Sequence, residues 1–140
     1  MTVRSGILAY TAGILDGEGC VMLTKKSYNA PRVGFYVLLV VTVVNTNEWL
    51  IQWLKMQFGG MATVETPLSN NSRDIWRWTV SSSKASDFLQ MILPYLQIKR
   101  PQAELAIKFQ TRKNKYQRLS ESERAMEEAN RFLMSKYNQR

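Results

Sequence analysis

The sequence has no histidine and only one cysteine, Cys20, among its 140 residues. The absence of histidine excludes a Ser-His-Asp triad, a His-ligated zinc site and any nuclease chemistry that depends on a histidine base. A single cysteine cannot form an internal disulfide, which fits a reducing compartment. A catalytic centre in this chain must therefore use carboxylates, lysine or arginine, backbone groups and bound metal ions.

Long hydrophobic runs are also lacking, although hydrophobic residues make up 45% of the sequence and suffice for a core. The most apolar stretch, residues 33–44, is about half the length of a membrane helix and is rich in β-branched residues, which indicates a buried strand. The first twenty residues lack the apolar stretch of a signal peptide. We therefore expect an intracellular protein of the cytoplasm or an organelle matrix, neither secreted nor membrane-bound.

Acidic residues are scarce, with eleven Asp and Glu against nineteen Lys and Arg, so the net charge is +8. The excess is concentrated in residues 99–118, which contain seven basic residues and only one acid, Glu104. Nucleic acid is the natural partner of such a segment, and the alternative is a solvated helix face that aids solubility. We predict that Arg100 and Lys113 of this segment contact DNA.

The hydrophobic spacing predicts an αββαββα order followed by C-terminal helices, in one α+β domain over residues 1–140. Its core would span about 5–112 and a C-terminal helical extension about 113–140. With no βαβαβ alternation and no Gly-rich phosphate loop, we expect no nucleotide cofactor. The first expected helix is capped by Thr2 or Ser5 and ended by a left-handed Gly17, and strands over 20–28 and 33–44 follow it. A second helix, capped by Thr46 or Asn47 and ended by Gly59-Gly60, precedes strands over 61–66 and 75–80. The remaining elements are a helix over 83–93 and helices from near Lys99 and from Ser120.

The first predicted helix contains small residues on one face. Ala9 and Gly13 are four residues apart, and Ala12 sits beside them, so this face is nearly bare. A bare face lets a second helix approach until the two backbones almost touch. We therefore predict that Ala9, Ala12 and Gly13 form a helix–helix interface between two copies of the chain.

Asp16 and Glu18 stand at the C-terminal end of this helix, where the negative end of the helix dipole makes carboxylates unfavourable. A positive group should offset them. A two-fold axis through the bare face would gather up to four carboxylates around cations. Oxygen ligands without His or Cys favour Mg²⁺ over zinc, with Mn²⁺ as an alternative, and such cations suit phosphodiester hydrolysis. Asp16 can bind metal or can cap and orient the chain, and the sequence leaves both open.

The stretch Thr11–Gly19, TAGILDGEG, resembles the nine-residue motif that names the LAGLIDADG homing endonucleases, with Thr11 in place of the opening leucine. The resemblance covers roughly residues 5–112. It is also carried by Asn45-Thr46-Asn47-Glu48, by Phe58-Gly59-Gly60, by the strand Trp76–Val80, and by Leu93–Lys99 followed by Gln102-Ala103.

The resemblance implies a saddle-shaped αββαββα fold whose antiparallel sheet lies in the DNA major groove. It also implies a homodimer that cuts a long, near-palindromic double-stranded target by metal-assisted hydrolysis, because chains with one motif pair through their motif helices. Glu18 would bind the metal with the carbonyl of Gly17, and Lys99 would act at the scissile phosphate or its attacking water. With Asp16, these residues form the predicted catalytic set.

The resemblance also has a departure. Family members use a glutamine or arginine just before and inside the second helix around the active-site water. The corresponding region here offers Val44 and Glu48, so we expect this outer shell to be missing or differently built. The alternative function is therefore an intron maturase or regulator, a DNA- or RNA-binding protein on the same scaffold with weak or lost cleavage.

Base reading would come from strand residues that face DNA. Even-numbered positions of the first two strands form one face, and Arg77 lies between two tryptophans expected to face helices. Lys26 and Arg77 can donate to guanine edges, whereas Leu38 and Val40 offer only contacts with thymine methyl groups. Besides Arg100 and Lys113, the predicted DNA contacts are Met22, Thr24, Lys26, Tyr28, Arg32, Tyr36, Thr42, Thr63, Glu65, Arg73 and Arg77.

Overall fold

The predicted α+β class and the αββαββα order are confirmed in the computed structural model of the chain. The structure describes residues 3–31, 33–68, 73–115 and 120–139. The elements are α1 (Val3–Glu18), β1 (Gly19–Ser27), β2 (Phe35–Asn45), α2 (Glu48–Phe58), β3 (Met61–Glu65), β4 (Ile75–Ser81), α3 (Ser82–Ile92), the short 3-10 helix η1 (Leu93–Tyr95), α4 (Arg100–Lys115) and α5 (Glu121–Asn138).

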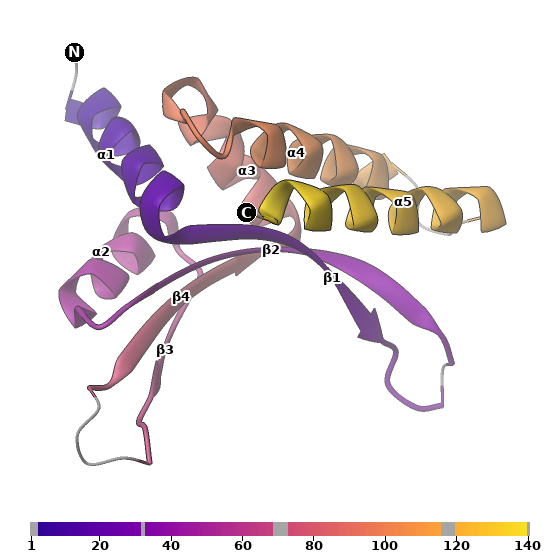
Figure 1. The fold of residues 1–140 in the computed structure, drawn as a ribbon, viewed down its shortest axis with the longest axis horizontal. Coiled ribbons are helices and arrows are strands. Elements are labelled where there is room, and N and C mark those ends of the chain that lie inside the picture. Colours follow the sequence, from indigo (N-terminus) through magenta and orange to yellow (C-terminus); the bar gives the residue numbers. More distant parts are fainter. Residues whose placement is uncertain (1–2, 32, 69–72, 116–119, 140) are drawn as a thin grey trace.

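The four strands form one antiparallel sheet in the order β1-β2-β4-β3. The sheet is arched. Its two hairpins extend to the same side and enclose a concave face, while the helices cover the convex side (Figure 1). The arch therefore has the predicted saddle shape, with one open face between the hairpins.

Alternate strand residues separate the two faces of the sheet. Val21 of β1 and Val41 of β2 are fully buried beneath the helices, and so is Trp78 of β4. The indole of Trp78 donates to the carbonyl of Gly59 at 2.8 Å, so its polar group is satisfied in the core. Because side chains alternate along a strand, even positions of β1 and β2 and odd positions of β4 face the concave side, as predicted.

The ends of α2 match the sequence prediction. Asn47 is its N-cap, with a side chain that accepts a hydrogen bond from the backbone N–H of Leu50 at 3.4 Å. Gly59 ends the helix with φ of 76°, and its N–H donates to the carbonyl of Lys55 at 2.8 Å. Gly60 also has positive φ, and a Cβ there would lie 2.6 Å from the Thr79 carbonyl oxygen, so glycine is required.

The prediction for the C-terminal end of α1 is wrong, and the N-cap prediction, Ser5 or Thr2, is contradicted only for Ser5. Ser5 lies inside the helix, which already starts at Val3, and Thr2 is outside the described residues. Gly17 does not end the helix in a left-handed conformation, because α1 continues to Glu18 and the glycines with positive φ are found elsewhere. The bonds made by Asp16, described below, hold this last turn in place.

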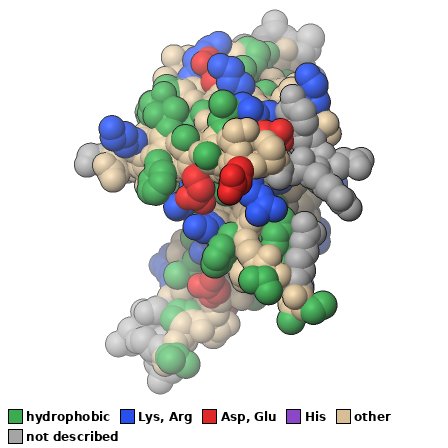
Figure 2. All heavy atoms as spheres, turned by 90° about the vertical axis from the view of Figure 1, so that its right-hand side faces the viewer, with side chains coloured by type: hydrophobic (Ala, Val, Ile, Leu, Met, Phe, Trp, Pro, Cys, Tyr) green, Lys and Arg blue, Asp and Glu red, His purple; other side chains and the backbone are tan. Residues whose placement is uncertain are grey.

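The C-terminal helix α5 packs onto the same core as the rest of the chain. Met134 is buried there, and the side-chain amide of Asn138 donates to the carbonyl of Val21 at 2.8 Å. Ser120 caps the helix, as predicted, by accepting from the N–H of Glu123 at 3.3 Å. Seen from the β1–β2 hairpin, acidic and basic side chains are interspersed (Figure 2), in agreement with ion pairs such as Lys25–Glu128 at 3.6 Å.

Within the described part of the chain, none of the helices is both long and apolar enough to traverse a lipid bilayer.

Candidate active site

The carboxylate of Asp16, in the last turn of α1, binds the chain segment that precedes α4. One oxygen accepts from the backbone N–H of Gln97 at 2.9 Å, and the other accepts from Ile98 at 3.1 Å and from Lys99 at 2.9 Å. These are the N–H groups just before a helix, where a negative charge is favourable. Asp16 therefore caps and orients this segment, which is one of the two roles that the sequence left open.

The side chain of Lys99 in turn binds the C-terminal end of α1. Its ammonium group donates to the backbone carbonyl of Asp16 at 2.9 Å, one of the carbonyls left without a helical partner at the end of α1. The cation thus lies at the negative end of the helix dipole, and the expected positive group is identified. Lys99 also acts on Cys20: burial raises the pKa of this thiol, and the nearby ammonium partly opposes the rise.

Glu18 is the last residue of α1, and its side chain is exposed. One of its oxygens accepts a hydrogen bond from the side-chain amide of Asn45 at 2.7 Å. The Asn45 carbonyl oxygen in turn accepts from the backbone N–H of Asn47, the N-cap of α2, at 2.8 Å. The start of α2 therefore fixes the orientation of Asn45, and Asn45 fixes Glu18.

Asn45 is a site residue that the sequence reasoning did not identify. From Val44 and Glu48 we expected the outer shell of the site to be missing or differently built. The polar side chain beside the acid is that of Asn45, which lies between these two residues in the sequence. The available signal was an asparagine two residues before the helix cap, in a stretch already similar to the family pattern.

The ligands for a metal ion are hard oxygen atoms, but one chain supplies few of them. Among residues 3–31, 33–68, 73–115 and 120–139, no group of three or more Asp, Glu, Cys or His side chains is placed to hold a metal ion. The available donors are the Glu18 carboxylate and the carbonyl of Gly17 in the last turn of α1. This donor set fits Mg²⁺ in kind, and it is too small for a complete coordination shell without further oxygen ligands.

The outer face of α1 carries no side chain at three glycine positions, with the exposed ring of Tyr10 among them. A Cβ added at Gly6, Gly13 or Gly17 would meet nothing within 4 Å. Ala9 is partly exposed on the same side, whereas Ala12 is fully buried in the chain's own core and does not contribute to this face, contrary to the prediction. Helical spacing alone could not tell which of the two small-residue faces packs inward.

A groove of about 670 Å³ runs along this bare face and joins it to the candidate site. Tyr10 and Trp49 line it and are 53% and 63% exposed, which is unusual for large aromatic side chains. The other lining residues are Ala9, Gly13, Ile14, Gly17, Glu18, Asn45, Asn47 and Leu50. Glu18 and Asn45 thus border the same surface as the bare helix.

The concave face of the sheet gathers most of the predicted DNA contacts. On β1 and β2 these are Met22, Thr24, Lys26 and Tyr36, and all are at least partly exposed. Thr63 and Glu65 are exposed on the edge strand β3, next to Arg77, whose guanidinium lies 4.0 Å from the Glu65 carboxylate. Thr42 is on this face but only 6% exposed, so its side chain has almost no surface left for DNA.

The remaining predicted contacts are dispersed. Tyr28 packs against Tyr36 with 5.0 Å between the ring centroids, Arg73 is exposed before β4, and Arg32 lies outside the described residues. Arg100 forms an ion pair with Glu104 at 3.2 Å. These positions remain predictions.

Lys113 has a structural environment that was not expected. Its ammonium group contacts the Val37 carbonyl at 2.5 Å and the Glu127 carboxylate, itself only 9% exposed, at 3.4 Å. A cation paired with a buried acid is not available to a phosphate group. The geometry therefore does not support a DNA contact for Lys113.

No protein-family model and no curated protein sequence matches the chain. Solved structures do match. The homing endonuclease I-CvuI, bound to its target in the presence of calcium, has a TM-score of 0.78 at 20% identity, over 98% of this chain and 85% of that chain. The archaeal intron-encoded homing endonuclease I-Vdi141I, complexed with DNA, has a TM-score of 0.80 at 15% identity, over 98% and 87%. The LAGLIDADG homing endonuclease I-SmaMI, bound to cleaved DNA, has a TM-score of 0.61 at 20% identity, and 42% of its chain is covered.

Proposed function

We propose that this chain, which has the fold of the LAGLIDADG homing endonucleases, is a site-specific endonuclease that cuts double-stranded DNA as a homodimer. The observation that carries the proposal is the junction of α1 with β1. An exposed acid, Glu18, is oriented there by Asn45 at 2.7 Å, and the ammonium of Lys99 is anchored 2.9 Å from the carbonyl of Asp16. A ligand for a hard cation and a positive charge for a phosphate thus meet at the end of one helix.

Each residue of this junction has a distinct task. Glu18 and the Gly17 carbonyl would hold Mg²⁺, which supplies an activated water and stabilises the leaving oxygen. Asn45 restricts the Glu18 carboxylate to one orientation, so less ordering is needed when the ligand set is completed. Lys99 would stabilise negative charge on the scissile phosphate or orient the attacking water. Asp16 is a positioning residue, since its carboxylate binds the backbone that carries Lys99.

The homodimer follows from the bare face of α1. A two-fold axis along this face would bring two α1 helices together at Gly6, Gly13 and Gly17, which carry no side chain of their own. The exposed rings of Tyr10 and Trp49 would be covered at the edges of the same contact. Two copies of Glu18 would then lie near one another, which supplies the oxygen ligands that one chain lacks.

The target would lie in the concave face, as the family resemblance implies, and the solved relatives are complexed with DNA. Lys26 and Arg77 can donate to guanine edges in the major groove, and Thr24 can donate or accept. Leu38 and Val40, at the centre of β2, offer only apolar contact, so base recognition should be weakest where they lie. A dimer doubles this pattern and gives a long, near-palindromic site.

A binding protein with weak or lost cleavage, such as an intron maturase, is the alternative. It rested on the absence of a polar shell at Val44 and Glu48. Because Asn45 provides an amide beside Glu18, this argument loses its force. Cleavage itself decides between the two functions.

The test is a cleavage selection on a randomised near-palindromic DNA library, first with Mg²⁺ and then with Ca²⁺. The proposal requires symmetric cut products in Mg²⁺ and bound, uncut DNA in Ca²⁺. Retention without cutting in both ions would refute the nuclease and support the binding protein. Cut products that lack symmetry would refute the homodimer.

The catalytic assignment is tested by Glu18→Gln, which keeps the size and most hydrogen bonds of the side chain but removes its charge. We expect loss of cutting with DNA binding retained. Glu121→Gln, which neutralises an exposed acid in the first turn of α5, is the matched control and should cut normally. Continued cutting by Glu18→Gln would show that another residue holds the metal ion.

A further inference from the structure

The concave face of the sheet carries one acidic side chain. Odd positions of β3 pair with odd positions of β4 and so share this face. Among the concave-facing positions of strands β1 to β4, all of which the structure describes, Glu65 is the only Asp or Glu. It is exposed, and its carboxylate lies 4.0 Å from the guanidinium of Arg77. A phosphate group presents only acceptor oxygens, so this acid opposes attraction of the DNA backbone to Arg77.

The sheet holds Arg77 in a defined place. Its neighbours along β4, Trp76 and Trp78, pack against the core beneath the helices, so the Arg77 side chain lies on the concave face. The side chains of Arg77 and Glu65 remain 39% and 67% exposed, so both can contact a further molecule. A donor and an acceptor are thus presented side by side on two neighbouring strands of a rigid sheet.

We propose that Arg77 and Glu65 together read a single G·C base pair in each half of the target, an inference that rests on the proposed function. In the major groove, guanine presents two acceptors, N7 and O6, and the paired cytosine presents the N4 amino group as a donor beside them. Arg77 can donate to both guanine acceptors while Glu65 accepts from the cytosine amino group. The order of donor and acceptor on the protein therefore matches the order of groups across this base pair, which a phosphate does not offer.

The same two side chains disfavour the other base pairs. Adenine and thymine each offer the guanidinium of Arg77 only one acceptor in the major groove, so one of its N–H groups stays unpaired. In the reversed C·G pair, Glu65 would face the acceptors of guanine and Arg77 the amino group of cytosine. A charged group left without its partner in an interface is costly. Glu65 therefore fixes which DNA strand carries the guanine, which Arg77 alone would not do.

The experiment retains duplexes from a randomised near-palindromic DNA library on the full chain in Ca²⁺ and sequences them, so it does not depend on cleavage. The wild-type protein should prefer G·C at one position of each half-site by about tenfold or more. The exchange variant Glu65→Arg/Arg77→Glu keeps the net charge and should convert this position to C·G while the other positions stay unchanged. Glu65→Gln should lose the preference over A·T, because an amide can also donate to thymine O4.

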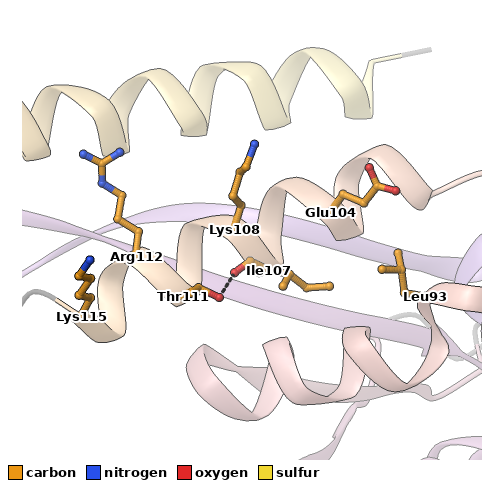
Figure 3. Close-up of a pocket in the computed structure, with 7 residues that line it drawn as sticks. All are labelled: Leu93, Glu104, Ile107, Lys108, Thr111, Arg112 and Lys115. Atoms are coloured by element: carbon orange, nitrogen blue, oxygen red, sulfur yellow. Dashed lines mark hydrogen bonds between the residues drawn. The ribbon is translucent and has the colours of Figure 1, made fainter.

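A matched control exchanges the same two residue types on the opposite side of the molecule. Glu104 and Arg112 both line a groove on α4 (Figure 3), among the helices of the convex side (Figure 1). Glu104→Arg/Arg112→Glu also keeps the net charge and should select the wild-type sequence. Exposed ion pairs contribute little to stability, so each variant should fold, which a thermal melt verifies.

Three results of the exchange variant would overturn the inference and leave the proposed function standing. Selection of the wild-type sequence would mean that Arg77 and Glu65 form an ion pair that reads no base. A change at two positions of each half-site would mean that the residues read separate base pairs. Equal loss of affinity for all sequences would mean that Arg77 contacts a phosphate. Failure of the wild-type protein to retain any duplex would instead refute the proposed function, and this inference with it.

Discussion

Replacing Asp16 by alanine removes the acceptor of three backbone N–H groups at once, those of Gln97, Ile98 and Lys99. Hydrogen bonds to a charged group contribute about 1.5–3 kcal/mol when buried, but water can replace part of these, so about 0.5–1 kcal/mol each is appropriate. The free energy of unfolding should therefore fall by about 2 kcal/mol. For a domain of this size that corresponds to a decrease in Tm of about 4–8 °C.

The same substitution frees the backbone that carries Lys99, and a displacement of about 1 Å at a reacting centre can cost about a hundredfold in rate. Single-turnover cleavage of the selected target, at a temperature where the variant is fully folded, should fall by this amount. Calorimetry gives Tm, with Asp87→Ala, at an exposed aspartate of α3, as the control. An unchanged Tm of Asp16→Ala would refute the contribution of the three hydrogen bonds to stability. A lowered Tm with unchanged cleavage would refute the role of Asp16 in positioning Lys99.

Asp16→Asn separates positioning from metal binding. Asparagine can still accept from Ile98 and Lys99 through one oxygen, but its NH₂ group would face the N–H of Gln97. We expect about half of the loss in Tm seen with alanine. If the variant instead keeps its Tm and needs more Mg²⁺ for cleavage, Asp16 is a metal ligand and the positioning argument is wrong.

Further predictions concern the bare helix face, the thiol on the concave face and the asparagine beside the acid. Gly13→Leu should convert the proposed dimer to a monomer in sedimentation velocity without unfolding it, because a Cβ there meets nothing within 4 Å in its own chain. A dimer of unchanged stability would exclude this face as the interface. Burial raises the pKa of Cys20, so at neutral pH its alkylation should be slower than that of free cysteine. Lys99→Gln should slow the alkylation further, because it removes the positive charge that lowers this pKa. A faster reaction in the variant would contradict the proximity of Lys99 and Cys20. Asn45→Ala should reduce cleavage while sparing binding in Ca²⁺, and normal cutting would mean that Glu18 needs no fixed orientation.

The parts of the fold predicted correctly are those in which local spacing and tertiary packing agree. The central odd positions of β1 and β2 are apolar and buried, namely Val21, Leu23, Val37, Leu39, Val41 and Val43, so the period of two in the sequence identified the faces of the sheet correctly. Gly59-Gly60 ends α2 because only glycine tolerates the backbone angles there, and such a signal is local. Glu18 and Lys99 were assigned by resemblance, and the structure brings both to the same helix end through Asp16.

The errors arise where the outcome depends on distant residues. Ala12 and Gly13 are equally small, and only the packing of α1 on the core decides that Ala12 is buried. Lys113 belongs to a basic segment of the kind that contacts DNA, but its ammonium group forms an ion pair with Glu127 of the next helix. Gly17 resembles a helix end, yet the bonds from Asp16 to residues 97–99 lie more than eighty positions away in the chain.

This last separation bears on the order in which the protein folds. The bonds between Asp16 and the segment before α4 close a loop of 81 to 83 residues, and the bond from Asn138 to Val21 spans 117. Contacts between residues this far apart in the sequence form after local hairpins and helices, because the chain must lose the entropy of closing the loop before such a contact can stabilise the fold. A growing chain that has been synthesised only as far as α3 can thus form the sheet that is proposed to face DNA without yet possessing Lys99. Under the proposed function, we therefore expect a nascent chain to acquire affinity for DNA before it acquires the ability to cut it.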